Sequence, residues 1–165
     1  MPDEVPLAEV EVRMRPGRMS QKGFLGEHER LTEVLSADAA TLTELGLTPD
    51  LLTERLEALL EPALLSRQSV IRIGHHRVRL ERYKGRQSCP FAPEPHLNPC
   101  PFGRGTKYGS VDWRIRNERS GIELTGPGLI VHLIGAHGFF EGFQSPYRVD
   151  PRALAGLLEV GPPGG

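Results

Sequence analysis

The chain has 165 residues, a length that suits one domain or one domain with a small appendage. Hydrophobic residues make up 38% and charged residues 25%, and the net charge is −1, values that are ordinary for a globular protein. The two cysteines and the short apolar runs exclude disulfide-framework and membrane-spanning classes, and the composition excludes collagen-like and coiled-coil chains. No basic segment followed by an apolar run opens the chain, so a cytoplasmic location is expected.

The first part of the chain, residues 1–66, is expected to form a helical portion. Residues 1–23 contain several prolines and glycines, and their alternating apolar residues predict at best one short strand before a loop. From residue 25 to 65, leucines recur at steps of three and four, which predicts two or three short helices. Ser36 is a plausible N-cap of one of them, and Pro62 should end or interrupt the last.

Residues 41–56 have the rhythm of a helix-turn-helix, a motif of DNA-binding regulators. Gly46 is placed to stop the first helix, and Thr48 followed by Pro49 is a start signal for the second. A helix that reads DNA begins with basic or polar residues, whereas this one begins with Asp50 and continues with two glutamates. The segment is therefore interpreted as a structural helical hairpin, with a DNA-binding regulator as an alternative.

Residues 67–160 are expected to form an α+β portion around a small antiparallel sheet, which together with the helical portion predicts an α+β fold in two portions or one compact domain. Loose alternation over 69–84 predicts a strand pair, and stricter alternation over 110–117 predicts a strand that returns at 122–125. The other expected elements are a helix over 127–137, a short helix over 151–158 and a disordered tail over 161–165.

Charge is distributed unevenly along the chain. Residues 1–66 carry 13 acidic and 6 basic side chains, a balance of −7, whereas residues 67–87 carry 7 basic side chains and 1 acidic, a balance of +6. This basic strip has three interpretations: a solvated strand edge, a surface complementary to the acidic part or to a protein partner, and a binding surface for nucleic acid. Its candidate binding residues are Arg72, Arg77, Arg79, Arg82, Lys84 and Arg86.

The two cysteines, Cys89 and Cys100, each open a Cys-Pro-Phe tripeptide in a proline-rich loop. His132 and His137 follow the predicted hairpin, which gives the spacing C-x10-C-x31-H-x4-H. Two thiolates and two imidazoles match the preference of zinc for four sulfur and nitrogen ligands in a tetrahedron. The sequence therefore predicts a Zn²⁺ site that fastens a loop with few apolar residues of its own to the following helix.

Other interpretations of these residues stay open. One alternative is that the cysteines form a disulfide, which a cytoplasmic location disfavours. Another is that they are inert thiols, with His132 a core histidine and His137 a cation at the end of a helix. His96, within the loop, is a candidate to replace one histidine ligand or to pair with Cys100 as a catalytic nucleophile. Glu141, which follows the last histidine, is a candidate general base if the metal keeps an open position.

The four candidate ligands and the order of hairpin and helix resemble Cys2His2 zinc-finger and treble-clef sites, at the level of the motif and over about residues 88–138. The resemblance implies a structural zinc ion, but the spacing departs from zinc fingers in the cysteine pair and in the long insert. The helix also carries no arginine that could reach a base edge. The stretches GFLG (23–26), HLIGAHGFFEG (132–142) and PYRVDP (146–151) look like a family of uncharacterised bacterial proteins, and this likeness implies no activity.

The function expected from the sequence is binding rather than catalysis. The chain would be a zinc-binding protein whose structural site supports an interaction surface for a protein, a second copy of itself or nucleic acid, with no membrane partner. The rival class is a zinc-dependent hydrolase with three protein ligands, a bound water and assistance from Glu141 or His96. Four good ligands without a nearby pair of spare acidic groups favour the closed, structural site.

Overall fold

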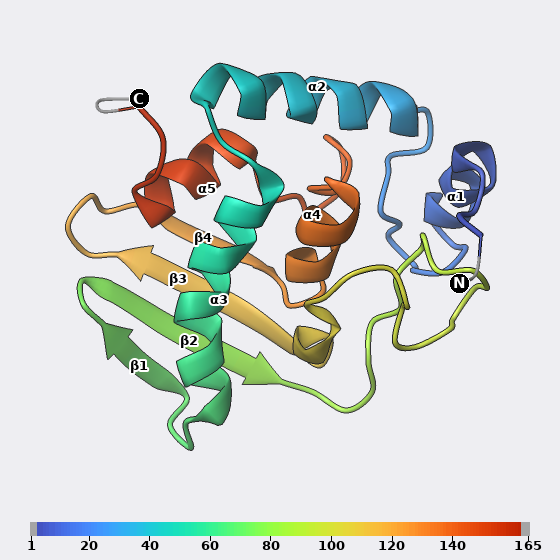
Figure 1. The fold of residues 1–165 in the computed structure, drawn as a ribbon. Helices are drawn as coiled ribbons and strands as arrows, with labels where there is room; N and C mark the ends of the chain where they lie inside the picture. Colours follow the sequence, from blue (N-terminus) through green and yellow to red (C-terminus); the bar gives the residue numbers. More distant parts are fainter. Residues whose placement is uncertain (1–2, 163–165) are drawn as a thin grey trace.

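A computed structural model describes residues 3–162, in which one antiparallel sheet is covered on one face by helices (Figure 1). The strands lie in the order β1 (Val70–Ile73), β2 (His76–Arg82), β3 (Val111–Asn117) and β4 (Glu123–Pro127). The helices are α1 (Leu7–Met14), α2 (Leu31–Leu45), α3 (Pro49–Leu65), α4 (Ile130–His137), α5 (Pro151–Leu158) and the short 3-10 helix η1 (Thr106–Tyr108). The expected α+β fold is confirmed.

Strand β3 shows how the sequence gives the sheet one buried face and one exposed face. Its seven residues alternate between buried and exposed, and Val111, Trp113 and Ile115 are the buried apolar ones. The indole nitrogen of Trp113 donates a hydrogen bond of 3.1 Å to the carbonyl of Pro127, so its one polar group is satisfied in the core. Because side chains alternate across a strand, the exposed residues of β3 all lie on the opposite face of the sheet.

The helices join the two predicted portions of the chain in one hydrophobic core. α3 contacts β1, β2 and α4, while α5 contacts β3, β4 and α2. Leu52, Leu56 and Leu60 of α3 are completely buried in the cluster that also contains Trp113 and Ile115 of the sheet. Among the described residues, none of the helices combines the length and the apolar character that crossing a membrane requires.

The connection between α2 and α3 forms as its local signals predict. Gly46 ends α2 in the left-handed conformation, with φ of 68°. Thr48 caps α3, since its hydroxyl oxygen accepts a hydrogen bond of 3.2 Å from the backbone N–H of Leu51. Pro49 is the first residue of the helix, where its missing N–H costs nothing.

Replacing the cap by Thr48→Ala should lower the free energy of unfolding by about 1 kcal/mol, because the N–H of Leu51 loses its acceptor. Urea unfolding monitored by circular dichroism measures the change. Thr43→Ala is the matched control, since Thr43 is an exposed residue inside α2 and alanine favours helix there. Equal losses in the two variants would contradict the capping role.

The structure overturns the expectation of a strand near the N-terminus. Residues 7–14 form helix α1, because Val10 and Met14, four residues apart, are both fully buried on one helix face. Leu7 and Val12, which created the alternating pattern, are exposed.

Two further expectations in the helical portion are wrong. α2 begins at Leu31 with Arg30 at its N-cap, so Ser36 lies inside the helix, because Leu31 and Val34 must both reach the core. α3 continues through Pro62 to its end at Leu65, because Leu59, Leu60 and Ala63 around the proline are buried in the core and the proline removes only the hydrogen bond of its own N–H.

Towards the C-terminus, the expected helix over 127–137 begins only at Ile130, because Pro127 belongs to β4. The expected tail over 161–165 lies outside the described residues from residue 163 onward.

Candidate metal centre

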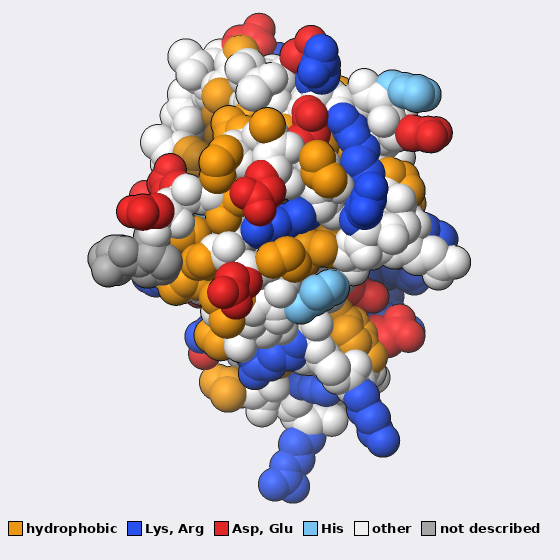
Figure 2. Space-filling view, turned by 90° about the vertical axis from the view of Figure 1, so that its right-hand side faces the viewer, with side chains coloured by type: hydrophobic (Ala, Val, Ile, Leu, Met, Phe, Trp, Pro, Cys, Tyr) orange, Lys and Arg blue, Asp and Glu red, His pale blue; other side chains and the backbone are white. Residues whose placement is uncertain are grey.

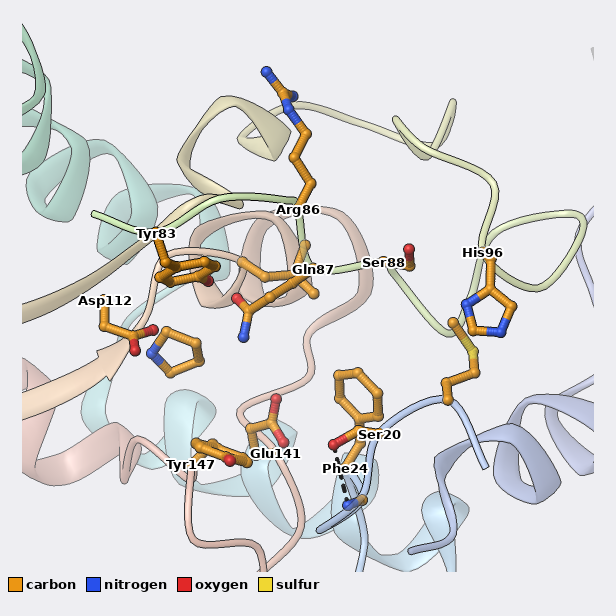
Figure 3. Close-up of a pocket in the computed structure, with 14 residues that line it drawn as sticks. Ser20, Phe24, Tyr83, Arg86, Gln87, Ser88, His96, Asp112, Glu141 and Tyr147 are labelled. Carbon is orange, nitrogen blue, oxygen red and sulfur yellow. Dashed lines mark hydrogen bonds between the residues drawn. The ribbon is translucent and has the colours of Figure 1, made fainter. Parts of the chain in front are cut away.

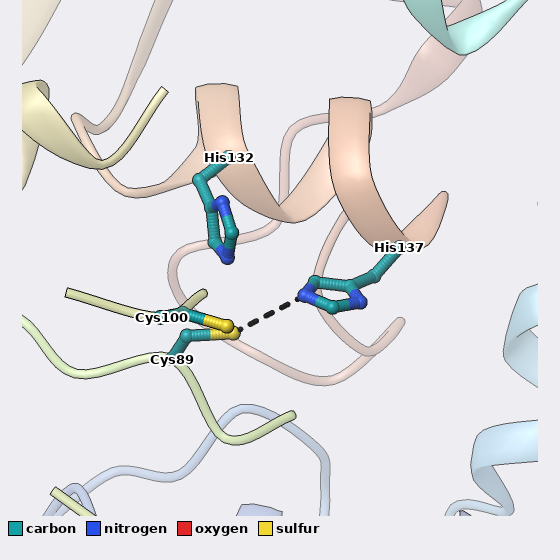
Figure 4. A group of neighbouring side chains, drawn as sticks. All are labelled: Cys89, Cys100, His132 and His137. Atoms are coloured by element: carbon teal, nitrogen blue, oxygen red, sulfur yellow. Dashed lines mark hydrogen bonds between the residues drawn. The ribbon is translucent and has the colours of Figure 1, made fainter. Parts of the chain in front are cut away.

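Cys89, Cys100, His132 and His137 meet at one point between the long loop and α4 (Figure 4). One ligand atom of each residue lies within 4.8 Å of those of the other three, and His137 alone among them is only half-buried. Zinc bonds of about 2.0–2.3 Å separate the ligand atoms of a tetrahedral site by about 3.3–3.8 Å, which is close to this spacing. The group is therefore able to hold a metal ion.

The loop that carries the cysteines is attached to α1 and to the hydrophobic core. Arg13 of α1 is buried, and one of its guanidinium nitrogens donates to the carbonyl oxygens of Pro90 at 3.2 Å and Ala92 at 2.6 Å. Phe91 and Ala92 lie in the hydrophobic core. The loop therefore has more attachments than its few apolar residues suggest, and Arg13 is a positioning residue that sequence reasoning missed.

Two glycines allow the chain after Cys100 to approach α4. Gly103 and Gly105 have φ of 89° and 90°, a region that favours glycine. A Cβ atom on Gly103 would lie 2.6 Å from the Cβ of Ala136, and one on Gly105 would lie 3.0 Å from the backbone nitrogen of His132. This close approach places a backbone carbonyl beside the first histidine.

That carbonyl orients the ring of His132, which is completely buried. Its Nδ1 donates a hydrogen bond of 2.8 Å to the carbonyl oxygen of Arg104. The proton is then on Nδ1, and Nε2 carries a free lone pair. Nε2 is buried and has no hydrogen-bond partner, as is typical of a ring nitrogen that binds a metal.

His137 is the last residue of α4, and Gly138 ends the helix in the left-handed conformation with φ of 64°. Phe91 stacks on the imidazole of His137 at 4.1 Å between ring centroids, and the two rings are nearly parallel. The centroid of the His132 ring is 5.0 Å away, so the offset of about 140° between residues five apart does not separate the two side chains. Nε2 of His137 lies 3.5 Å from the sulfur of Cys89.

The two thiols influence each other strongly. The hydrogen bond from Cys89 lowers the pKa of Cys100 well below its usual range, and His132 and His137 act in the same direction. The same hydrogen bond raises the pKa of Cys89, and burial raises it further. The site therefore favours a thiolate at Cys100, the form that binds a metal.

The geometry argues against the alternative interpretations of the two cysteines and of His132. Both cysteines are free thiols rather than a disulfide. A core histidine that is merely buried would have both ring nitrogens satisfied, which is not so for His132. His96 is an exposed loop residue outside the group of four ligands, so the structure does not bring it together with Cys100.

Glu141 is not one of the four grouped residues and instead lines a pocket of about 320 Å³ (Figure 3). His96 and Asp112 line the same pocket. Glu141 is 2% exposed and accepts a hydrogen bond of 3.0 Å from the hydroxyl of Ser145. Burial raises the pKa of Glu141 to about 8, and the hydrogen bond from Ser145 only partly opposes this.

The raised pKa of Glu141 makes stability depend on pH in a definite direction. Between its ordinary pKa of 4.5 and about 8, the unfolded chain releases the proton while the folded protein keeps it. The free energy of unfolding therefore falls as pH rises, by at most about 1.4 kcal/mol per pH unit. Glu141→Gln should flatten this dependence between pH 6.5 and 8, measured by urea unfolding. The exposed control Glu27→Gln should keep the wild-type slope, and an unchanged slope in Glu141→Gln would contradict the assignment.

The structure divides the basic strip. Arg72, Arg77 and Arg79 lie on the exposed face of the sheet, and Arg72 forms an ion pair of 3.2 Å with Glu118. Arg82 instead donates to the carbonyls of Ala63, Leu64 and Ser66 at the end of α3, at 2.9–3.2 Å.

Lys84 and Arg86 lie in the loop after β2. The candidate recognition helix α3 is buried on one side, and its exposed side carries Asp50 and Glu54 against Arg55, which is unfavourable beside phosphate.

Comparison with models of protein families gives no match, and comparisons with curated proteins and with solved structures give none either.

Proposed function

We propose that the chain is a zinc protein in which Cys89, Cys100, His132 and His137 hold one structural Zn²⁺, and that it acts as an interaction module. The observation that carries the proposal is the lone pair on Nε2 of His132. It is buried without a partner beside two cysteine sulfurs, while Nδ1 is held by the carbonyl of Arg104. Two sulfurs and two imidazole nitrogens form the set that zinc prefers.

A structural role is favoured over hydrolysis by the composition of the group. Four protein ligands fill a tetrahedral zinc, whereas a catalytic zinc has three and a bound water. Among the described residues, no carboxylate joins the four ligands, and Glu141 faces a different pocket. The zinc would fasten the cysteine loop to α4 and so fix the surface around it.

Elemental analysis of the freshly purified protein tests the metal. We expect about one zinc per chain, and loss of that zinc in Cys100→Ser and in His132→Ala. His96→Ala is the matched control, because His96 lies in the same loop but outside the group, and this variant should keep its zinc. A protein without metal, or one that loses zinc equally in the control, would overturn the proposal.

X-ray absorption spectroscopy at the zinc edge separates the two classes of site. Two sulfur and two nitrogen ligands support the structural centre. An oxygen ligand in place of one of these would favour the open site of a hydrolase.

A further inference from the structure

The exposed face of the sheet carries a square of four arginines. Arg77 and Arg79 lie on β2, and Arg114 and Arg116 lie on β3. In the register of the two strands, Arg77 is opposite Arg116 and Arg79 is opposite Arg114. The second strand of the square lies outside the basic strip of the sequence, so only the sheet brings the four together.

This arrangement is unfavourable for the protein by itself. Like charges directly opposite each other on neighbouring strands destabilise a sheet. Within residues 3–162, none of the four guanidinium groups forms an ion pair or a hydrogen bond with another side chain. They line a hollow of about 190 Å³ in which Glu123 is the one acidic lining residue. An anion bound there would relieve the repulsion.

Two other arginines of the basic strip, Arg72 and Arg82, have structural roles. Arg72 is paired with Glu118, and Arg82 caps the end of α3. Although Glu123 on β4 is opposite Arg116, the guanidinium groups of the square form no such ion pair or cap among the described residues, which sets them apart from basic residues that serve the fold. Figure 2 shows one face of the molecule, on which acidic, basic and hydrophobic side chains are mixed.

The chemistry of the square favours phosphates. A guanidinium group donates two parallel hydrogen bonds to phosphate oxygens, and strands hold neighbouring groups at fixed spacing. A protein partner needs an apolar centre in its interface. The residues opposite the square on β1 and β4 are Val70, Arg72, Glu123 and Thr125, and the one apolar residue among them, Val70, is partly buried. None of the exposed residues in the four strands is aromatic, but Tyr147, from the segment before α5, lines a second hollow together with Arg79 and Arg114. Stacking of a base on this single ring does not depend on which base it is.

We propose that Arg77, Arg79, Arg114 and Arg116 bind the phosphate backbone of a nucleic acid, without selecting its bases. Glu81 and Asp112, which are opposite each other further along the same strands, repel phosphate and limit the footprint to the end with the arginines. This inference deepens the proposed function by naming the partner of the interaction module, and it does not depend on the metal.

Salt dependence gives the first test, with a fluorescently labelled single-stranded oligonucleotide and a duplex of the same length. Four phosphate contacts predict that affinity falls about 50-fold for the single strand and about 150-fold for the duplex between 50 and 200 mM salt. Base composition should leave the affinity unchanged. The absence of binding at 50 mM salt would overturn the proposal.

The variant Arg79→Gln/Arg114→Gln removes one opposed pair. Because two contacts remain, the same change in salt should then lower affinity only about 7-fold for the single strand and about 12-fold for the duplex. Arg79→Lys/Arg114→Lys keeps the charge and should keep the wild-type salt dependence. The matched control Arg30→Gln/Arg55→Gln removes two exposed arginines from the helices, and it should bind as the wild type does.

Two further measurements complete the design. Zinc content and the melting temperature should be unchanged in every variant, because the four substituted arginines are exposed. If the purified protein contains no zinc but still binds oligonucleotide through the square, the zinc proposal is refuted and the nucleic-acid proposal stands. Equal loss of binding in the control variant would overturn the square as the nucleic-acid surface. Tighter binding of polyglutamate, or of vesicles containing phosphatidylserine, would assign it to another partner.

Discussion

Removal of zinc with a chelator should lower the melting temperature of the protein by on the order of 10–20 °C. Structural zinc supplies roughly 10–16 kcal/mol in small zinc-dependent modules. In this chain Arg13 and Phe91 also hold the cysteine loop, so the loss should be smaller, on the order of 5 kcal/mol. For a domain of this length, each kcal/mol corresponds to about 2–4 °C.

After chelation, the cysteine loop should lose its structure before the rest of the protein unfolds. Residues 88–105 should become sensitive to protease after chelation, because Cys89 and Cys100 no longer hold the loop against α4. Cys100→Ser and His132→Ala should reproduce the effect, while His96→Ala should melt as the wild type does. A protein that binds one zinc but keeps the same melting curve after complete removal would refute the structural role. The zinc-dependent hydrolase would then become the leading hypothesis.

Arg148→Met should lower the free energy of unfolding by about 3–5 kcal/mol, because it leaves a carboxylate buried without its partner. Arg148 donates two hydrogen bonds to the carboxylate of Asp38 on α2, at 2.8 and 3.0 Å, and a third to the carbonyl of Glu141 at 2.8 Å. The side chains of Arg148 and Asp38 are only 13% and 4% exposed. The pair therefore ties α2 to the segment before α5 in a place with little screening by water.

Arg152→Met is the matched control for this prediction. Arg152 also joins α2 to the C-terminal segment, through an ion pair with Glu44, but the two side chains are 53% and 67% exposed. Exposed pairs contribute about 0–1 kcal/mol, so this variant should change stability little. Urea unfolding at neutral pH compares the two variants. Similar losses at Arg148 and Arg152 would show that the buried pair is not a major source of stability.

The sequence by itself determined those features whose cause lies within a few neighbouring residues. Thr48 with Pro49 starts α3, and Asp150 with Pro151 starts α5, because a cap and a fixed φ act within one helical turn. The alternation over residues 111–117 predicts β3 because neighbouring side chains of a strand must face opposite ways.

The four candidate ligands also come from the sequence, because a metal restricts which residue types can meet around it. Their residue types make Cys89, Cys100, His132 and His137 the leading candidates without any knowledge of the fold, and the structure brings the same four together.

Only the tertiary structure decided the interactions between residues far apart in the chain. Arg13 is 77 residues from Pro90, and Arg148 is 110 residues from Asp38, so no local pattern indicates either contact. The start of α2 was likewise set by which side chains reach the core, and burial of Val10 and Met14 made residues 7–14 a helix. The register of β2 and β3 placed Arg114 and Arg116 beside the basic strip, because strand pairing depends on the packing of the whole sheet.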